Sequence, residues 1–220
     1  MRLKRSGLYV VIDKDVCANR NIVKAAKDAC EGGADIVQLR DKTSASLDML
    51  EACGKIKKIA QKKGVKFIVN DRIDIALASG AHGVHLGQTD LPIRFARKVL
   101  GPGKIIGISA SNMTQARIAA REGADYIGLG PVFATRTKRD AGRPIGVKRL
   151  RAVFKRIKNT LIIPIGGIKE RSMGNMVLSG ARWIAVAGAA TCSKDVKGST
   201  RRLKERLNYY IKKDDSRSHE

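Results

Sequence analysis

The sequence is poor in aromatic residues and in cysteine. Aromatic residues make up 4% of 220 residues, and there are four cysteines and three histidines. Because bases of single-stranded nucleic acids are usually bound by stacking on aromatic side chains, this composition argues against a nucleic-acid platform. The cysteines, Cys17, Cys30, Cys53 and Cys192, form no CxxC pair and have no histidine cluster nearby. Neither a zinc site nor a disulfide framework is predicted.

Long hydrophobic runs are also lacking. The N-terminal stretch MRLKRSGLYVVIDKD contains an apolar run of at most six residues, which is too short for the core of a signal peptide or for a membrane span. No other segment approaches the length of a span. We therefore expect a cytoplasmic protein of a reducing compartment that makes no membrane contact.

Acidic residues are scarce compared with basic ones. The 44 Lys and Arg against 20 Asp and Glu give a formal charge of +24, which favours anionic partners. The positive charges are scattered through helical-looking segments such as 57–63, 149–158 and 201–206. We interpret most of them as solvated helix faces and expect no nucleic-acid partner. The oligomeric state, including a homo-oligomer, stays open.

Short apolar runs alternate with longer segments of helical periodicity. The runs are strand-sized and rich in β-branched residues. They lie at 8–12, 36–39, 67–69, 83–86, 105–108, 126–129, 161–165 and 183–187. Eight strands alternating with helices predict an α/β fold with a parallel sheet, and eight strands close as a TIM (β/α)8 barrel. We expect one barrel over residues 1–211 and a charged, disordered tail over 212–220.

A short repeat supports this alternation. Gly-Ala occurs at 33–34, 80–81, 123–124 and 180–181, immediately before the second, fourth, sixth and eighth predicted strands. Glycine often ends a helix in the left-handed conformation. One interpretation is a βαβα unit used four times; the other is coincidence in a short pattern.

Polar residues and glycines are concentrated where the predicted strands end. In a TIM barrel these C-terminal ends share one mouth, where substrates bind. The residues are Asp13, Gln38, Arg40, Lys42, Asn70, Asp71, His85, Gln88, Asp90, Ser109, Ser111, Gly166, Gly167 and Gly188. The stability of a barrel does not require polar residues and glycines at this end of the strands, so we place the active site at this mouth.

The loop after the sixth strand, 128–144, has the composition of an anion site. Thr135 to Arg139 supply two hydroxyls and three positive charges in five residues, and such groups hold phosphate oxygens well. The alternative is a solvated basic loop. The glycines after strands seven and eight match the place where these barrels build phosphate sites from backbone N–H groups. We therefore predict a monophosphate site near strands six to eight.

Two carboxylates, Asp71 and Asp90, follow adjacent predicted strands. Mg²⁺ often takes one or two carboxylates and completes its shell with water and phosphate. Each residue has an alternative role as the N-cap of the helix that follows it. Their occurrence together, beside Arg40, Lys42 and Lys138, favours a metal-bridged diphosphate near strands two to five.

Amide and imidazole side chains complete the predicted mouth. Gln38 and Asn70 carry both donors and acceptors, which suit an aminopyrimidine edge better than a phosphate. For His85 the alternatives are a buried histidine with satisfied hydrogen bonds and a residue that shapes the site. We assign His85, together with Gln88, to orientation.

The motifs resemble those of the thiamin-phosphate synthase family. They are VQLRDK at 37–42, VNDR at 69–72, GVHLGQTD at 83–90, GIS at 107–109, GLGPVFATRTK at 128–138 and PIGGI at 164–168. The family condenses 4-amino-2-methyl-5-hydroxymethylpyrimidine diphosphate with a thiazole phosphate, which is 4-methyl-5-(2-phosphoethyl)thiazole or its carboxylated form. The resemblance implies a transferase of thiamin biosynthesis that releases pyrophosphate by a dissociative, Mg²⁺-assisted mechanism.

Position by position, the resemblance also implies a role for each site residue. The pyrimidine diphosphate set is Gln38, Leu39, Arg40, Asp41, Lys42, Asn70, Ser109 and Lys138, of which Arg40, Lys42, Ser109 and Lys138 are catalytic. The thiazole phosphate set is Thr135, Arg136, Thr137, Gly167, Ala187 and Gly188. Asp71 and Asp90 hold Mg²⁺, and His85 and Gln88 orient. Two positions depart from the family, which often has Glu at 41 and commonly has Ser at 188.

Two other functions remain as alternatives. The related thiazole tautomerases share the barrel and the thiazole phosphate loop but have no use for a diphosphate or Mg²⁺. The presence of Gln38, Asp71 and Asp90 argues against that function. The other alternative is a basic nucleic-acid-binding module built on an inactive barrel.

Overall fold

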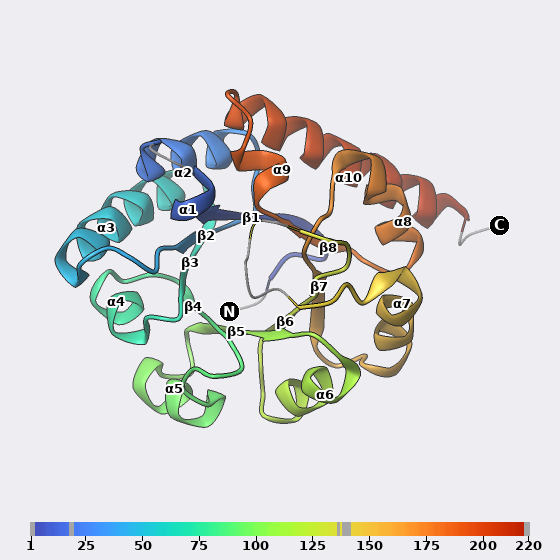
Figure 1. Cartoon of the computed structure of the whole chain (residues 1–220), viewed down its shortest axis with the longest axis horizontal. Coiled ribbons are helices and arrows are strands. Elements are labelled where there is room, and N and C mark those ends of the chain that lie inside the picture. Colours follow the sequence, from blue (N-terminus) through green and yellow to red (C-terminus); the bar gives the residue numbers. More distant parts are fainter. Residues whose placement is uncertain (1–2, 18–19, 136, 138–141, 218–220) are drawn as a thin grey trace.

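The computed structural model describes residues 3–17, 20–135, 137 and 142–217. Eight parallel strands run through these residues, with helices between them (Figure 1). They are β1 (Gly7–Asp13), β2 (Ile36–Arg40), β3 (Lys66–Asn70), β4 (Gly83–Leu86), β5 (Ile105–Ala110), β6 (Tyr126–Leu129), β7 (Leu161–Pro164) and β8 (Trp183–Val186). All eight predicted strands are confirmed.

The strands pair in the order β7-β6-β5-β4-β3-β2-β1-β8. Strand β1 pairs with β8 from Gly7 opposite Trp183 to Val10 opposite Val186, and β7 contacts β8 at the remaining seam. The sheet is therefore a nearly closed barrel, and the predicted TIM fold is confirmed.

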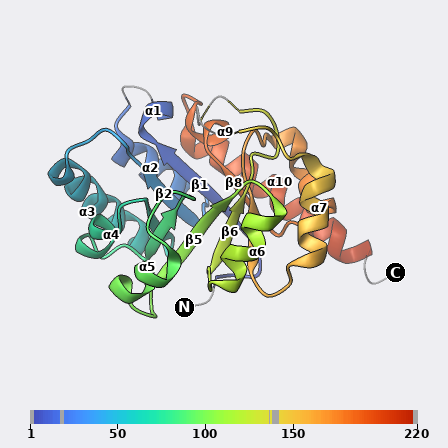
Figure 2. The same cartoon turned by 60° about the horizontal axis from the view of Figure 1, so that its bottom comes forward.

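Helices surround the barrel (Figures 1 and 2). They are α1 (Lys14–Cys17), α2 (Ile22–Glu31), α3 (Ser46–Lys62), α4 (Ile73–Ala78), α5 (Ile93–Leu100), α6 (Met113–Arg121), α7 (Gly146–Arg156), the 3₁₀ turn η1 (Glu170–Ser172), α8 (Met173–Leu178), α9 (Gly188–Thr191) and α10 (Val196–Arg217). Asn21 caps α2 by accepting hydrogen bonds from the N–H groups of Val23 and Lys24.

The apolar residues form two cores. The larger core fills the space between strands and helices, and the smaller one fills the barrel interior. The interior core includes Tyr9, Ile68, Tyr126 and Trp183. Trp183 lies at the N-terminal end of β8 against Gly7, where a side chain on the glycine would collide with the indole ring. This packing fills the barrel at the end opposite the strand exits.

The Gly-Ala repeat ends four helices, as the sequence predicted. Gly33, Gly80, Gly123 and Gly180 have φ of 97°, 66°, 86° and 109°. Each following alanine donates its N–H to a carbonyl five residues back, as Ala34 does to Ala29 at 3.2 Å and Ala81 to Ala76 at 3.0 Å. Glycine is needed here because the left-handed backbone is unfavourable for residues with a Cβ atom.

The residue after three of these Gly-Ala pairs accepts a hydrogen bond from the preceding strand. Asp35 Oδ2 accepts from the N–H of Leu8 at 2.9 Å, and Asp125 Oδ2 accepts from the N–H of Ile106 at 2.7 Å. His82 Nδ1 likewise accepts a hydrogen bond from the N–H of Phe67 at 2.9 Å. A short sequence repeat therefore encodes both the end of a helix and the placement of the next strand.

The expectation of a disordered tail from residue 212 is wrong for residues 212–217. Helix α10 continues to Arg217, and residues 218–220 lie outside the described part of the chain. Arg182 holds this end of the helix, because its Nη2 lies 2.8 Å from Asp214 Oδ2 and 2.9 Å from Asp215 Oδ1. The composition of the tail does not reveal its ion pairs with Arg182, which lies about 30 positions earlier in the chain.

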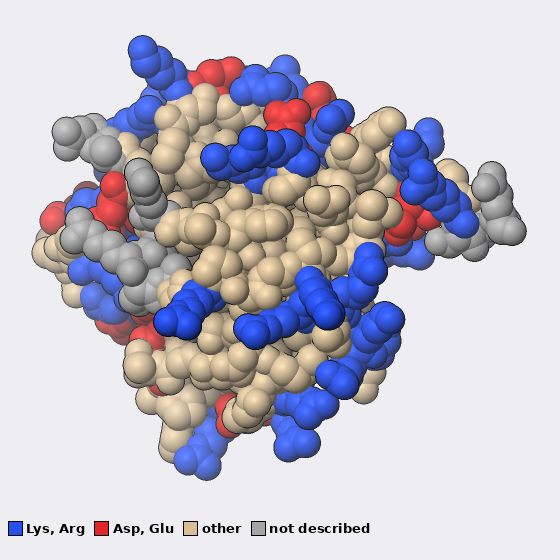
Figure 3. All heavy atoms as spheres, turned by 45° about the vertical axis from the view of Figure 1, so that its right-hand side comes forward, with Lys and Arg blue, Asp and Glu red and all other residues tan. Residues whose placement is uncertain are grey.

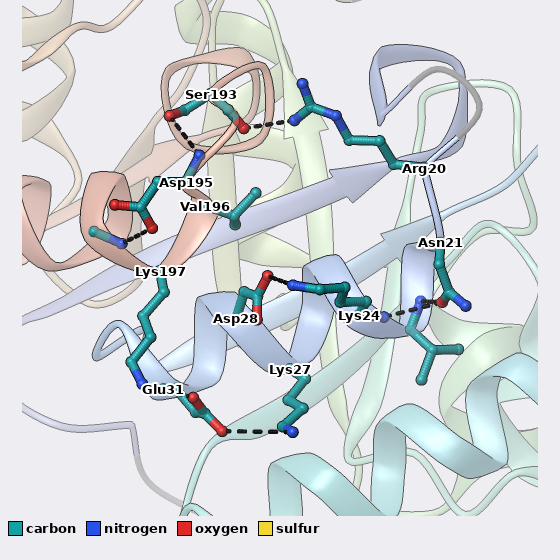
Figure 4. A network of polar contacts seen from close by, with 12 residues as sticks. Arg20, Asn21, Lys24, Lys27, Asp28, Glu31, Ser193, Asp195, Val196 and Lys197 are labelled. Carbon is teal, nitrogen blue, oxygen red and sulfur yellow. Dashed lines mark hydrogen bonds and ion pairs between the residues drawn. The ribbon is translucent and has the colours of Figure 1, made fainter.

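Charged residues on the helices pair locally or face solvent. Figure 4 shows Lys24 paired with Asp28 along α2, and Arg20 reaching the carbonyl of Ser193. Lys197 at the start of α10 lies 2.8 Å from Glu31. On the side formed by α7, α8 and α10, Lys and Arg lie in separate groups with uncharged surface between them (Figure 3). Within the described residues, no helix has the length and apolar character that a membrane crossing requires.

Candidate active site

A cavity of about 1120 Å³ opens at the C-terminal ends of the strands. Most residues that the sequence predicted for the site line it. They are Gln38, Arg40, Lys42, Asn70, Asp71, His85, Gln88, Asp90, Ser109, Thr135, Thr137, Gly167, Ala187 and Gly188. Arg136 and Lys138 lie outside the described residues. The barrel thus brings residues from β2 to β8 together around one space.

The side chains of Leu39 and Asp41 do not line this cavity. Leu39 is fully buried in the core between strands and helices. Asp41 Oδ1 accepts hydrogen bonds from the N–H groups of Thr43 at 3.0 Å and Ser44 at 2.9 Å, which shapes the loop after β2. Neither residue is among those that line the cavity, and their part in substrate binding stays a prediction.

Asp71 occupies a strained position at the exit of β3. Its φ is 60°, which is uncommon for a residue with a side chain. The backbone is held there because its N–H donates to the carbonyl of His85 at 2.8 Å. Such strain persists where the surroundings fix it, and it is often found at functional sites.

Asp90 belongs to the loop after β4, where its Oδ2 accepts a hydrogen bond from the N–H of Gly87 at 2.6 Å. The residues at the N-cap positions of α4 and α5 are Arg72 and Pro92. Neither Asp71 nor Asp90 is therefore a helix cap, and the alternative role that the sequence left open for each is wrong.

The Asp71 carboxylate affects the ionisation of Asp90. Desolvation raises the pKa of Asp90 above its ordinary value, and the neighbouring Asp71 carboxylate raises it further. Lys42 Nζ lies 3.2 Å from Asp71 Oδ2 and offsets part of this charge. Among the described residues, no group of three potential metal ligands gathers. Two adjacent carboxylates fit Mg²⁺, which commonly completes its shell with water and substrate phosphate.

Arg40 is held by Asp13, a residue that was predicted to lie at the mouth but was given no role there. Its Nη1 donates to Asp13 Oδ2 at 2.6 Å, and the Asp13 side chain is 3% exposed. A guanidinium group has five N–H donors, so a single bond to Asp13 fixes Arg40 and leaves donors for an anion in the cavity.

A chain of hydrogen bonds crosses the barrel beneath the cavity. Gln38 Nε2 donates to Tyr9 Oη at 2.8 Å, and Tyr9 Oη lies 2.8 Å from Tyr126 Oη. His85 continues the chain, with Nδ1 2.9 Å from Tyr126 Oη and Nε2 2.9 Å from Ser109 Oγ. The prediction that His85 orients other groups fits this position, although the two tyrosines were missed.

A signal for Tyr9 was present in the sequence. Alternate residues of a strand point to the same face, and Tyr9 and Asp13 are four residues apart in β1. The polar ending of the strand therefore implied that the Tyr9 hydroxyl also points into the barrel. Gln88, the second orienting residue, donates from Nε2 to the carbonyl of Ser109 at 2.7 Å.

The part of the mouth formed by β6, β7 and β8 is built differently. Gly166 and Gly167 have φ of 96° and 65°, and a Cβ atom on Gly167 would lie 2.5 Å from the carbonyl oxygen of Ala134. The N–H of Phe133 donates to the carbonyl of Gly166 at 3.0 Å. These contacts fix the base of the loop after β6 against the exit of β7.

The loop after β6 comes close to the exit of β8 at Thr137. The N–H of Thr137 donates to Thr135 Oγ1 at 3.2 Å. A side chain at Gly188, the first residue of α9, would meet Thr137 Oγ1 at 3.4 Å and Cys192 Sγ at 3.2 Å. Glycine backbone and threonine hydroxyls therefore lie at this part of the cavity, which Lys169, Glu170 and Arg202 also line.

Comparison with known proteins identifies relatives along nearly the whole chain. A family model described as thiamine monophosphate synthase matches residues 8–190. The thiamine-phosphate synthase of Shouchella clausii is 41% identical over 204 residues, covering 91% of this chain and 96% of that protein. The enzyme of Moorella thermoacetica is 43% identical over 198 residues, covering 90% and 94%.

A solved structure agrees with these relatives. The thiamine phosphate pyrophosphorylase from Pyrococcus furiosus superposes with a TM-score of 0.86 at 33% identity. The match covers 93% of this chain and 96% of that one. The likeness therefore extends over nearly the whole barrel.

Proposed function

Because the chain belongs to the thiamine monophosphate synthase family, we propose how its cavity carries out that synthesis. The protein is an enzyme of thiamine biosynthesis, a thiamine-phosphate synthase. We propose that its substrates are 4-amino-2-methyl-5-hydroxymethylpyrimidine diphosphate and 4-methyl-5-(2-phosphoethyl)thiazole. The observation that carries this proposal is that one cavity is lined by Arg40, Lys42 and two carboxylates at the exits of β2 to β4 and by the positive-φ backbone of Gly166 and Gly167 at the exit of β7.

The proposed pyrimidine diphosphate site lies at the exits of β2 to β5. Gln38 and Asn70 face the aminopyrimidine edge with amide groups. Arg40 and Lys42, with Lys138 from the loop after β6, neutralise the diphosphate. Ser109 donates a hydrogen bond to it. The fixed Arg40–Asp13 pair, at 2.6 Å, supports a preorganised cation at this place.

The Mg²⁺ ion would be held by Asp71 and Asp90. Support comes from the effect of the Asp71 carboxylate on the pKa of Asp90, which indicates that the two are close, and from the strained backbone of Asp71. When bound, the ion supplies positive charge to the diphosphate oxygens. Lys42, at 3.2 Å from Asp71, connects the metal residues with the cations around the diphosphate.

The proposed thiazole phosphate site lies at the exits of β6 to β8. Thr135 and Thr137 supply hydroxyls, and Gly167, Ala187 and Gly188 supply backbone N–H groups. Arg136 contributes a positive charge. Support comes from the glycine backbone at β7, which lets main-chain groups approach an anion closely.

The proposed reaction needs no protein nucleophile. The bond between the pyrimidine methylene carbon and the diphosphate oxygen breaks, and both electrons leave with pyrophosphate. The amino-substituted ring stabilises the resulting cation. The lone pair of the thiazole nitrogen then forms the new C–N bond. The protein contributes by holding the two substrates in line and by stabilising negative charge on the leaving group.

We place this reaction in the cytoplasm. Cys17, Cys30 and Cys53 are buried and Cys192 is exposed, each as a free thiol. Free thiols are characteristic of reducing compartments.

The test is the formation of product from defined substrates. The purified chain is incubated with both substrates and Mg²⁺, and thiamin phosphate and pyrophosphate are quantified by chromatography and mass spectrometry. We expect one pyrophosphate for each thiamin phosphate and no product when either substrate is omitted. A tautomerase would instead interconvert carboxythiazole phosphate isomers without pyrimidine diphosphate, and that result alone would contradict the proposal.

A further inference from the structure

The hydrogen-bond chain beneath the cavity contains two residues that the proposed mechanism does not use. Tyr9 and Tyr126 are 2% and 1% exposed, and their rings meet edge to face with centroids 5.7 Å apart. The His85 ring stacks on Tyr126 at 5.5 Å. The chain joins Gln38 on β2 to Ser109 on β5, two residues that line the cavity.

The protons along this chain have one consistent direction. Gln38 Nε2 can only donate, so Tyr9 Oη accepts from it. The single proton of Tyr9 is then available for Tyr126 Oη at 2.8 Å. Tyr126 can then donate its own proton to His85 Nδ1, which lies 2.9 Å away and is an acceptor when the imidazole proton is on Nε2.

This direction fixes the remaining groups. With Nδ1 as the acceptor, the His85 proton is on Nε2, which donates to Ser109 Oγ at 2.9 Å. The Ser109 hydroxyl proton is therefore free to point into the cavity. At the other end, the Gln38 amide directs Nε2 to Tyr9 and keeps Oε1 as an acceptor. Burial raises the pKa of both phenols, so they keep their protons at neutral pH.

We propose that Tyr9 and Tyr126 are positioning residues that make Gln38 present an acceptor and Ser109 a donor to one substrate. This inference rests on the proposed function. The exocyclic amino group of the pyrimidine is a donor and needs the Gln38 acceptor, whereas the diphosphate oxygen is an acceptor and needs the Ser109 donor. The opposite direction, with the Gln38 amide turned over, would present the wrong group at both ends.

Tyr126→Phe tests the kinetic consequence, because it keeps the ring and removes only the hydroxyl. We expect kcat/KM for pyrimidine diphosphate to fall roughly tenfold, which is the loss of about one charge-assisted hydrogen bond. The KM for the thiazole phosphate should be unchanged. Tyr210→Phe is the matched control, because Tyr210 lies on α10 under the Arg206 guanidinium and should not alter either constant.

Imidazole ¹⁵N NMR tests the proton positions without any turnover. His82 is an internal reference, because its Nδ1 accepts the Phe67 N–H and its proton must be on Nε2. We expect His85 to show the same tautomer in the unaltered protein and a mixture of tautomers in Tyr126→Phe, with His82 unchanged. Tyr9→Phe keeps the Tyr126–His85 bond but removes the donor that directs the Tyr126 proton, so it should lower kcat/KM and also give a mixture of His85 tautomers.

The two measurements separate this inference from the proposed function. An Nδ1-protonated His85 in an active synthase would overturn the inference alone. So would kinetic constants that stay unchanged in both Tyr126→Phe and Tyr9→Phe. A protein with the expected tautomers that makes no thiamin phosphate would overturn the proposed function alone. If Tyr126→Phe fails to fold, Tyr9→Phe and the unaltered protein still decide the question.

Discussion

The two parts of the mouth are held in place by different kinds of contact. At the exits of β2 to β5, functional side chains are held by other side chains, as Arg40 is by Asp13 at 2.6 Å and Lys42 by Asp71 at 3.2 Å. At the exits of β6 to β8 the backbone itself is shaped, with Gly166 and Gly167 at positive φ.

This difference matches the charges that we propose for the two substrates. A diphosphate leaving group gains negative charge during the reaction, so positioned cations and a metal ion act on the chemical step. The thiazole phosphate keeps its charge, so backbone N–H groups are sufficient to hold it. Changes in the first region should therefore alter kcat, and changes in the second should alter the KM for the thiazole substrate.

The largest effect should come from the carboxylates of the first region. Asp71→Asn or Asp90→Asn removes a negative ligand from the proposed Mg²⁺ site, and we expect kcat to fall by about a thousandfold, equivalent to several kcal/mol. Steady-state kinetics at several Mg²⁺ concentrations measures this. The control is Asp74→Asn, since Asp74 is exposed on α4 and pairs with Arg72. Normal turnover with unchanged Mg²⁺ dependence in Asp71→Asn would remove the metal assignment.

Lys138→Ala should have the next largest effect. Loss of one preorganised cation from the leaving group should lower kcat roughly a hundredfold to a thousandfold at saturating substrates. Arg139→Ala, one residue further along the same loop, is the control and should be nearly silent. If the two variants behave alike with small effects, the loop is a solvated basic turn. Bound substrates should protect the loop from proteolysis. This protection should persist in Lys138→Ala if only leaving-group stabilisation is lost, and it should disappear if the loop fails to close.

Gly167→Ala tests the second region. An added Cβ would lie 2.5 Å from the Ala134 carbonyl oxygen, so the backbone must shift, and we expect the KM for the thiazole phosphate to rise roughly tenfold with kcat little changed. Gly101→Ala is the matched control, because Gly101 also has positive φ, 78°, but has open space around it. A rise in the KM for pyrimidine diphosphate instead would show that the two regions are not separate.

Gly188→Ser should slightly strengthen the binding of the thiazole phosphate in the second region. A new hydroxyl that makes one hydrogen bond to the thiazole phosphate would lower its KM about fivefold, equivalent to about 1 kcal/mol. Since the added Cβ lies 3.2 Å from Cys192 Sγ, the gain should be larger in combination with Cys192→Ala. The single and double variants, with Cys192→Ala alone as control, measure this by steady-state kinetics. An unchanged KM in both would contradict a role for that hydroxyl.

The smallest effect concerns stability and pH. The folded protein raises the pKa of Asp90 above 3.8, so the ionised carboxylate disfavours folding and stability without metal falls as the pH rises through this range. Asp90→Asn should therefore raise the Tm slightly at neutral pH and not below pH 3.8. Thermal unfolding without Mg²⁺ measures the difference. A lower Tm for Asp90→Asn at neutral pH would contradict the assigned cause.

The sequence was sufficient for the fold because its signals are local. Glycines at 33, 80, 123 and 180 end helices by their own conformational preference, and apolar runs mark the strands. The predicted lining of the mouth followed from the position of each residue relative to a strand end. Local signals failed at the C-terminus, where Arg182 holds Asp214 and Asp215 through contacts across the fold.

The connections within the site could not be predicted in the same way. The link between Gln38 and Ser109 passes through Tyr9, Tyr126 and His85. These five residues come from five different strands, β2, β5, β1, β6 and β4 in that order. Only the closure of the barrel brings these side chains together. The strain at Asp71 likewise depends on a backbone contact with the neighbouring strand.

The central claim is that the two parts of the mouth bind different anions independently. Calorimetric titration of Asp71→Asn and Gly167→Ala with Mg²⁺-pyrophosphate and with the thiazole phosphate tests it most directly. We predict a crossed result, in which Asp71→Asn loses pyrophosphate affinity alone and Gly167→Ala loses thiazole phosphate affinity alone. If both variants weaken both ligands equally, the mouth is a single site and the division proposed for it is wrong.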